Sequence, residues 1–304
     1  MRIGIGVPTR DGALSRGGLV EWAQRAEAAG FSSLAAFDRV VFPLHEPLVT
    51  LAILAGATDR IRLLASIVIA PTRETTLLAR QTASLDALSG GRFSLGVGIG
   101  VRRDDYAATG QAFETRGRRL DEQLPTLRRL WSGEPIESGP VGPIGARAAG
   151  PAGPELLIGG YIDAVARRVA AFGDGFMAPG GGAPDRMAAL WAEVRSAWEA
   201  AARPGRPRWV GSSYIALGPD AETQARDYIQ SAYAFDPALA ERRLRSIPQT
   251  AADVQAMIDR QAEMGVDEFV FRPCAADPDL IDRLWDAVSA LAVVRSGPAE
   301  LGAA

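Results

Sequence analysis

The side chains that could do acid–base or metal chemistry are few in this chain of 304 residues. His45 is its single histidine and Cys274 its single cysteine. One imidazole and one thiol cannot build a histidine-rich zinc or iron site, a thiolate cluster or an intrachain disulfide. They also disfavour a Ser-His-Asp hydrolase, because the one imidazole would have to stand beside the nucleophile. We therefore expect no metal site, and an organic cofactor that carries any difficult chemistry.

Charge and hydropathy exclude two classes of partner. The formal net charge is −3, and acidic and basic residues are mixed along the chain. This pattern offers no basic patch for nucleic acid and no polybasic membrane anchor, and no run reaches the ~20 apolar residues of a membrane span. The start, MRIGIGVPTR, has too short an apolar run for a signal peptide. We expect a cytoplasmic protein that binds neither nucleic acid nor membranes.

A glycine-rich strand end is the most distinctive local feature. In SLDALSGGRFSLGVGIG, residues 84–100, a helix stops at Gly90 and Gly91 and a strand restarts at Phe93. Gly98 and Gly100 remove side chains where that strand ends, so a ligand or another backbone can approach closely. The run is not a dinucleotide fingerprint, which needs its glycines at the first strand-to-helix turn. Tight strand packing is the alternative explanation.

The elements that must position these residues alternate along the chain. Apolar periodicity and turn residues predict strands over 2–7, 31–37, 61–69, 93–97, 155–158, 175–178, 208–217 and 268–272. They predict helices over 17–29, 46–57, 74–88, 115–131, 163–172, 186–201, 221–234, 251–264 and 280–293. The segments 101–114, 133–154 and 235–248 read as a charged loop, a surface loop and an insertion.

Eight strands alternating with helices favour a (β/α)8 TIM barrel, in a single domain of residues 1–304, over a doubly wound sheet. In such a barrel, function lies at the carboxyl ends of the strands. The candidate positions are therefore Pro8, Asp38 and Arg39, 66–70, 98–100, 159–161, 178–180, Tyr214 and Arg272.

Three runs resemble the bacterial luciferase-like family of flavin-dependent and deazaflavin-dependent oxidoreductases. They are PTRETTLLARQTASLDALSGGRFSLGVGIG, LLIGGYIDAVARRVAAFGDGF and MGVDEFVF, and the likeness extends over about residues 1–293. The resemblance implies a luciferase-like barrel with insertions at its C-terminal face. It also implies a bound flavin or deazaflavin, a small organic substrate and a homodimer, for which the helices 46–57 and 74–88 are candidate interface elements.

The family places an acidic or polar residue and a histidine after strand two. Here the matching pair is Asp38 and Arg39, which we take as candidate catalytic residues. Arg39 could bind an anionic group or stabilise a reduced flavin anion, but a guanidinium cannot serve as a general base. A salt bridge that ties the barrel top together is the alternative. His45, near the same strand end, is a candidate proton donor, with a capping or surface role as its alternative.

The resemblance also implies where the cofactor lies. A non-proline cis peptide after strand three matches Ala65 and Ser66, with an ordinary strand hydroxyl as the alternative for Ser66. Gly159, Gly160 and Tyr161 form a strand-to-helix turn of the kind that faces the cofactor's phosphate, although such turns also occur as plain connections. Some relatives grip this phosphate with an arginine after strand four, where this chain has Ile99.

Lids over substrate and cofactor are implied at 101–114 and 235–248. Tyr106, Tyr214, Tyr233 and Phe235 are candidate residues for an apolar substrate pocket, with barrel packing as the alternative. The charges at 102–105 read as a solvated loop. The acidic tail of a deazaflavin would favour cationic residues near the barrel mouth, and Arg39, Arg102 and Arg103 keep that option open.

These observations favour a monooxygenase that uses reduced FMN, delivered by a partner flavin reductase, and oxygen on a small organic substrate. The first alternative is hydride transfer with the deazaflavin coenzyme F420. A different class, a non-catalytic flavin-binding protein or partner subunit, follows from the departures at Arg39 and Ile99.

Overall fold

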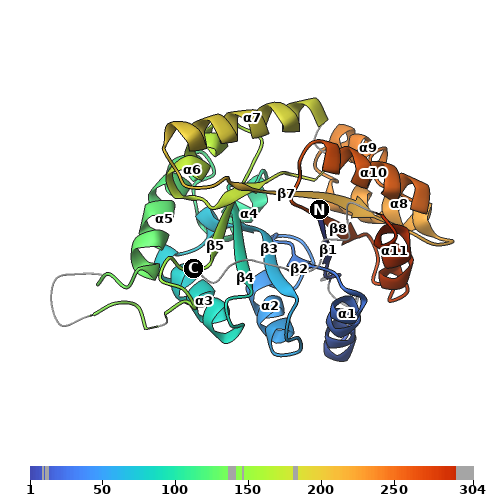
Figure 1. The fold of residues 1–304 in the computed structure, drawn as a ribbon, viewed down its shortest axis with the longest axis horizontal. Coiled ribbons are helices and arrows are strands. Elements are labelled where there is room, and N and C mark those ends of the chain that lie inside the picture. The colour runs from blue at the N-terminus through green and yellow to red at the C-terminus, as the bar shows by residue number, and fades with distance from the viewer. Residues whose placement is uncertain (9, 11–13, 136–141, 146, 181–183, 292–304) are drawn as a thin grey trace.

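Eight parallel strands close into a barrel in the computed structural model (Figure 1), which describes residues 1–8, 10, 14–135, 142–145, 147–180 and 184–291. Each strand pairs with the next one along the chain, and β8 pairs with β1. The predicted (β/α)8 architecture is thereby confirmed. The strands are β1 (Arg2–Gly6), β2 (Ser33–Ala36), β3 (Arg62–Ile69), β4 (Phe93–Gly98), β5 (Glu155–Gly159), β6 (Gly175–Met177), β7 (Arg208–Ile215) and β8 (Glu268–Pro273).

Helices surround the strands and connect each to the next (Figure 1). The principal ones are α1 (Arg16–Ala29), α2 (Pro47–Ala55), α3 (Thr75–Leu88), α5 (Arg116–Trp131), α6 (Ala164–Phe172), α7 (Pro184–Ala200), α10 (Ala251–Glu263) and α11 (Leu280–Ser289). Additional helical segments are η1 (Ala70–Thr72), α4 (Arg103–Ala108), α8 (Ala221–Ala232) and α9 (Pro237–Leu244). Two segments therefore hold more order than the sequence predicts, because α4 lies within the expected charged loop and α9 within the expected insertion.

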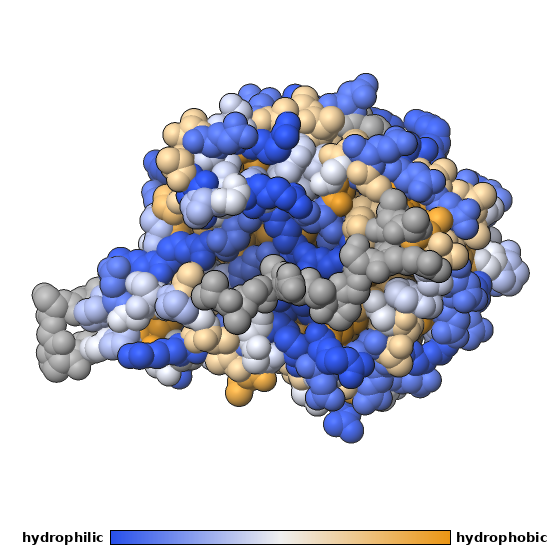
Figure 2. All heavy atoms as spheres, viewed as in Figure 1, coloured by the Kyte–Doolittle hydropathy of each residue, from blue (hydrophilic) through white to orange (hydrophobic). Residues whose placement is uncertain are grey.

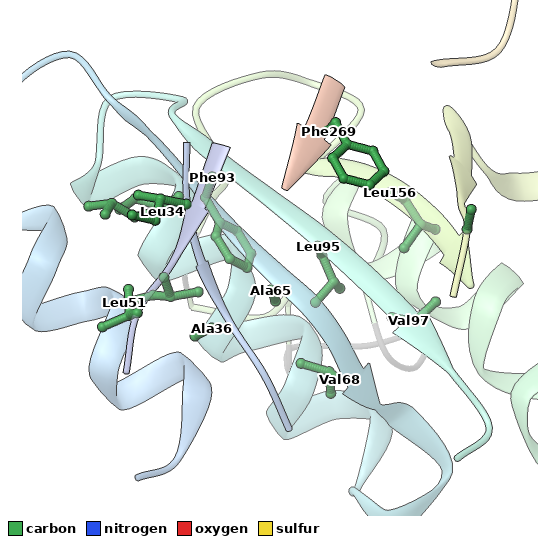
Figure 3. Close-up of a cluster of buried hydrophobic side chains, with 14 of the residues drawn as sticks. Leu34, Ala36, Leu51, Ala65, Val68, Phe93, Leu95, Val97, Leu156 and Phe269 are labelled. Atoms are coloured by element: carbon green, nitrogen blue, oxygen red, sulfur yellow. The ribbon is translucent and has the colours of Figure 1, made fainter. Parts of the chain in front are cut away.

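Side chains on the outer face of the barrel form the main core. Leu34 and Ala36 of β2 point towards Leu51 of α2, and all three are fully buried (Figure 3). Phe93 and Leu95 of β4 belong to the same cluster. Burial of these alternate strand residues fixes the register of each strand, because a slip of one residue would expose the whole apolar set.

The inside of the barrel is charged at its N-terminal end. Arg208 forms ion pairs with both Glu155 and Glu268. The Glu268 carboxylate also accepts hydrogen bonds from the Ser32 and Ser33 hydroxyls at 2.6 and 2.5 Å. We call these five residues the ionic base. Both carboxylates pair with Arg208, whose Nε alone among its guanidinium nitrogens is buried without a hydrogen-bond partner, so the base closes this end of the barrel with charges that are mutually compensated.

A small apolar layer lies above the ionic base. It consists of Ala35, Leu64, Leu157, Met177, Val210 and Val270, which are all buried and in mutual contact, with Ile67 packed against them. Above this layer the inward-facing side chains become polar again, with Ser66, Ser212 and Arg272 in contact. The barrel is therefore filled at its base and centre, which leaves its C-terminal mouth as the end where a ligand can enter between the strands.

The cis peptide bond of β3 joins Ser66 to Ile67, one residue later than the resemblance implies for Ala65 and Ser66. The pairing of β3 with β4 shifts register between Ala65 and Val68, around the same bond. Ile67 also explains the glycines of the strand ends. A Cβ on Gly98 would overlap the Ile67 side chain, and one on Gly159 would lie 3.1 Å from its Cγ2. The absence of side chains at Gly98 and Gly159 therefore makes room for the Ile67 side chain of the barrel itself.

Gly96 provides a test of this packing. Replacing it by alanine is expected to lower the free energy of unfolding by about 2 kcal/mol. The added Cβ would overlap the carbonyl oxygen of Ala65, a backbone atom that cannot rotate away, and would lie 3.0 Å from the Met177 sulfur. Urea unfolding measures the loss. Gly150→Ala is the matched control, because no atom lies within 4 Å of a Cβ there; equal stability of the two variants would contradict the packing.

The outer surface is mixed in character. Figure 2 shows hydrophilic side chains over most of one face, with apolar atoms in separate small patches. On α2 and α3, the expected interface helices, Val49, Ile53 and Leu77 are 61%, 40% and 59% exposed; a homodimer stays a prediction. Part of the expected surface loop 133–154, residues 136–141 and 146, lies outside the described residues. None of the helices in the described part of the chain has the length and apolarity that crossing a membrane requires.

Candidate functional site

A cavity of about 310 Å³ opens at the carboxyl ends of four strands. It lies beside Gly6 of β1, Ala36 of β2, Ser66 of β3 and Pro273 of β8, at the end of the barrel where a functional site is expected. The rest of the lining comes from the loops after these strands and from α8, and consists of Val7, Pro8, Arg10, Ala35, Phe37, Leu44, Gln224, Asp227, Tyr228, Arg272, Cys274, Ala275 and Ala276.

Arg272 places a cation in this lining. Its Nη2 donates to the hydroxyls of Ser66 and Ser212, both at 3.0 Å. Its guanidinium carbon lies 5.3 Å from the centre of the Phe37 ring and 6.0 Å from that of Tyr214. Its Nε is buried without a hydrogen-bond partner, and no carboxylate among the described residues pairs with it. The charge is therefore oriented by neutral groups and stays available for an anion.

A belt of phenols connects Arg272 to a second arginine. The Tyr214 hydroxyl lies 3.0 Å from the Tyr233 hydroxyl, and the Arg243 guanidinium carbon lies 5.7 Å from the centre of the Tyr233 ring. Arg243 in turn donates to the Tyr161 hydroxyl at 2.5 Å. Burial, together with neighbouring Tyr233 and Tyr228, raises the pKa of Tyr214 well above its usual value, so this phenol is neutral at physiological pH. Of the predicted site residues, the structure thus links Ser66, Tyr214 and Tyr161.

Asp38 and Arg39 do not pair with each other. The Asp38 carboxylate accepts from the Ile69 backbone N–H at 2.9 Å and from Arg73 at 3.0 Å. Burial raises the pKa of Asp38, and Arg73 and the Ile69 N–H oppose that rise only in part. Arg39 instead donates to Asp105 at 2.9 Å. Both residues form salt bridges that tie the barrel top together, each with a different partner from the one expected.

The charged segment 101–114 is only partly solvated. Asp105 is 1% exposed and accepts hydrogen bonds from the backbone N–H groups of Val40 and Val41 as well as from Arg39. Tyr106 is equally buried, and its hydroxyl donates to the Ile99 carbonyl at 2.6 Å. The expectation of a solvated loop is therefore wrong at Asp105, because this carboxylate docks α4 onto the loop after β2. Tyr106 anchors the same helix and does not line the cavity.

The remaining predicted residues lie apart from the cavity lining. His45 is exposed, and no described residue forms a hydrogen bond or ion pair with it. Phe235 is 43% exposed beneath Arg102, whose guanidinium carbon lies 4.7 Å from its ring centre. Gly100 has φ +60°, and a Cβ there would lie 3.0 Å from the Ile69 side chain. Gly159 and Gly160 lie at the end of β5, at the opposite side of the strand order from the cavity.

Four residues of the mouth were not among the sequence-based candidates. Tyr228, Asp227 and Cys274 line the cavity, and Arg243 is 6% exposed in α9. Burial raises the pKa of the Tyr228 hydroxyl, and it raises that of the Cys274 thiol to about 12, so both groups are protonated at neutral pH. Cys274 follows a strand end and could have been found by the barrel rule. The other three belong to the β7–α10 connection, whose path no local pattern reveals.

Comparison with known proteins identifies the family. The family model described as luciferase-like monooxygenase matches residues 1–291. The uncharacterised protein Rv0940c of Mycobacterium tuberculosis is 34% identical over 207 residues, which cover 60% of this chain and 71% of that protein. An F420-dependent glucose-6-phosphate dehydrogenase of Kribbella flavida is 32% identical over 180 residues, or 54% of this chain and 53% of that enzyme.

Solved structures share the fold at lower identity. The monooxygenase RslO1 of Streptomyces bottropensis superposes with a TM-score of 0.77 and 20% identity, over 95% of this chain and 99% of that one. An F420-dependent secondary alcohol dehydrogenase, in complex with an F420-acetone adduct, gives a TM-score of 0.74 and 18% identity over 97% and 100% of the two chains. With the family model covering nearly the whole barrel, this chain belongs to the luciferase-like monooxygenase family.

Proposed function

We propose that this protein is an oxidoreductase that transfers hydride between coenzyme F420 and a small organic substrate held in the 310 Å³ cavity. The observation that carries the proposal is the pair of arginines at the mouth, Arg243 and Arg272, for which no carboxylate partner exists among the described residues. F420 bears a phosphodiester and an acidic tail, and unpaired guanidinium groups suit such a polyanion better than they suit a ligand with one phosphate.

The arginines that the sequence offers for this purpose are neutralised. Arg39 pairs with Asp105, Arg102 with Asp104, and Arg103 with Glu114. Two cations near the mouth, Arg243 and Arg272, have buried guanidinium nitrogens and no carboxylate partner among the described residues. Arg10, a third cation in the cavity lining, is exposed. Two similar proteins whose names state F420 dependence, at 32% and 30% identity, support the same cofactor.

The residues present fit a bound deazaflavin in defined ways. The cofactor itself supplies the centre that accepts or delivers hydride. Ser66 and Ser212 hold the Arg272 guanidinium in a fixed position. From there it would stabilise negative charge that develops on a substrate in the cavity. Tyr228 and Cys274 stay protonated, so they shape the cavity without acting as bases. Asp227 is the carboxylate in the lining.

Asp227 gives the first functional prediction. If the substrate is an alcohol, hydride leaves its carbon while the hydroxyl proton moves to a base, and Asp227 is placed to accept that proton. Asp227→Asn is expected to lower kcat/KM for alcohol oxidation about a hundredfold and to leave the Kd for F420 unchanged. Loss of cofactor absorbance during turnover measures the first, and an anaerobic titration the second. Asp220→Asn, at the start of α8 and outside the cavity lining, is the control; equal activities of the two variants would remove Asp227 from the mechanism.

A monooxygenase that uses reduced FMN and oxygen is the second candidate. It is favoured by the buried titratable groups of the lining, since Tyr228 and Cys274 are protonated at neutral pH and oxygenation requires no side-chain base. This candidate needs a flavin reductase as a partner. FMN has a single phosphate, so one of the two unpaired arginines, Arg243 or Arg272, would be free to bind the substrate.

Equilibrium binding separates these functions. The purified chain is titrated anaerobically with F420 and with FMN, each oxidised and reduced, and oxygen is then admitted to the reduced complexes. Tight binding of F420 alone, with complexes that are stable to oxygen, is the expected result. Preference for reduced FMN, with rapid consumption of oxygen, would replace hydride transfer by oxygenation. Binding of neither would favour a non-catalytic barrel or partner subunit.

A further inference from the structure

The helical layer leaves a second cavity on the outside of the barrel, over β7. Val210 and Ser212 of this strand face the barrel interior, where they belong to the apolar layer and hold Arg272. Because strand side chains alternate, Gly211 and Ser213 face outward, towards the space between α7 and α10 (Figure 1). These small residues leave a cavity of about 270 Å³, which we call the outer cavity. Protein layers seldom contain voids much larger than a water molecule, so a space of this size is a candidate binding site.

The floor and walls of the outer cavity offer an adaptable apolar surface. Trp209 of β7 and Phe269 of β8 contribute to it, and both are nearly fully buried. Met187 of α7 and Met257 and Met264 of α10 line it as well. Methionine is unbranched and has three rotatable bonds, so it adapts to the shape of what it packs against. The lining therefore suits a flexible aliphatic chain.

Two arginines add positive charge to this lining, one before α10 and one at its end. Arg245 precedes the helix and Arg260 lies in its last turn, and both are exposed. Neither forms an ion pair within the described part of the chain. Asp253 also lines the cavity, but its carboxylate accepts from the backbone N–H groups of Gln249 and Thr250 as part of the helix cap. Unpaired guanidinium groups beside apolar surface favour a ligand with an acidic head group.

We propose that the outer cavity binds an aliphatic carboxylate of the fatty-acid class, with its chain along β7 and its carboxylate on Arg245 or Arg260. At about 3.3 Å per residue, the strand from Trp209 to Ser213 is about 13 Å long, which suits an unbranched chain of medium length. The two faces of β7 then serve two sites, since Ser212 holds Arg272 on the inner face. This inference concerns a site outside the barrel and does not depend on the identity of the cofactor.

Calorimetric titration of the full chain tests the class of ligand. Hexanoate, heptanoate and octanoate are each titrated below the concentration at which they form micelles. We expect one saturable site per chain, with an affinity that rises about fourfold for each added methylene group. Octyltrimethylammonium has an alkyl chain as long as that of octanol but carries a cationic head, so it should bind at least about tenfold more weakly than octanoate.

Two kinds of variant test the location. Ala256 is an exposed residue of α10 that lines the outer cavity, so Ala256→Phe should fill the cavity and lower the affinity for octanoate at least about tenfold. Ala252→Phe, on an exposed position of the same helix outside the lining, is the matched control and should bind as the wild type does. An unchanged Tm shows that each variant is folded.

The arginine variants identify the residue that receives the carboxylate. Arg245→Met, Arg260→Met or both should lose about tenfold in affinity for octanoate, because a charge-assisted hydrogen bond is removed. Arg242→Met, exposed on α9 and outside the lining, should keep the affinity of the wild type.

Three results would overturn the proposal. Wild-type affinity for octanoate in Ala256→Phe would place the ligand elsewhere on the protein. Unchanged affinity in both Arg245→Met and Arg260→Met, or equal binding of octyltrimethylammonium and octanoate, would remove the carboxylate from the recognition. A wild type that binds none of the three acids at a saturable site would show that the outer cavity is not a site for this class of ligand.

Discussion

Replacing Glu268 by glutamine should lower the free energy of unfolding by about 3 kcal/mol. The carboxylate is fully buried and pairs with Arg208, so the amide would leave that guanidinium with Glu155 alone. Uncompensated buried charge is the costly outcome of breaking such a pair. Urea unfolding at neutral pH measures the loss. Glu222→Gln, which breaks an exposed i,i+4 pair with Arg226 on α8, is the control and should cost less than about 0.5 kcal/mol.

The same carboxyl makes the effect depend on pH. Burial alone would raise the pKa of Glu268, but Arg208, Arg2 and the hydroxyls of Ser32 and Ser33 hold it at about 2, below the usual value of 4.5. A depressed carboxyl pKa contributes stability that is fully present above pH 4.5 and is lost as the pH falls towards 2. The stability difference between the wild type and Glu268→Gln should therefore shrink over this range. A difference that stays constant down to pH 2 would refute the assignment.

Removing the charge of Arg272 is the substitution expected to cost most activity. Arg272→Met should lower kcat/KM by about 10²–10³-fold, because a preoriented cation beside developing negative charge contributes on this scale. Ser66 and Ser212 hold the guanidinium in one orientation, so a solvent cation or water molecule would not restore the oriented charge in the variant. The assay is F420 reduction with a panel of small alcohols, followed by the cofactor's visible absorbance.

Two further variants separate charge from packing. Arg10 also lines the cavity but is exposed, and Arg10→Met should reduce kcat/KM by less than about tenfold. Arg272→Lys keeps the charge and loses the fork that contacts both serines, so its activity should fall between those of Arg272→Met and the wild type. Similar activities for Arg272→Met and Arg10→Met would show that the position of the charge does not matter.

The barrel could be predicted from the sequence because its signals are local. Each strand is a short apolar run with glycine, proline or a charged residue at its end or within three residues after it, and each long helix has its own apolar face. The role of Gly98 could not be derived in the same way, since it depends on Ile67 of β3, whose side chain packs against glycines of β4 and β5. Local pattern therefore identified the glycines without identifying the side chain that they admit.

The candidate site was harder to predict, because its charges come from separate parts of the chain. Asp38 and Arg39 are adjacent in sequence, yet their partners are Arg73 and Asp105, 35 and 66 residues away. Arg243 reaches Tyr161 across 82 residues. A charged segment has the same sequence pattern whether it is exposed to solvent or packed against the rest of the protein. Only the tertiary structure shows that Asp105 is buried.

The ionic base and the mouth are separated by the apolar layer that includes Leu64, Val210 and Val270. Substitutions far apart and without shared partners have additive effects on stability. Directed evolution of the mouth towards a new substrate can therefore proceed without disturbing the salt bridges of Arg208, and variants weakened by that remodelling can be rescued by stabilising changes at the opposite end. The mouth can therefore be changed for a new function, while the opposite end of the barrel maintains the stability of the fold.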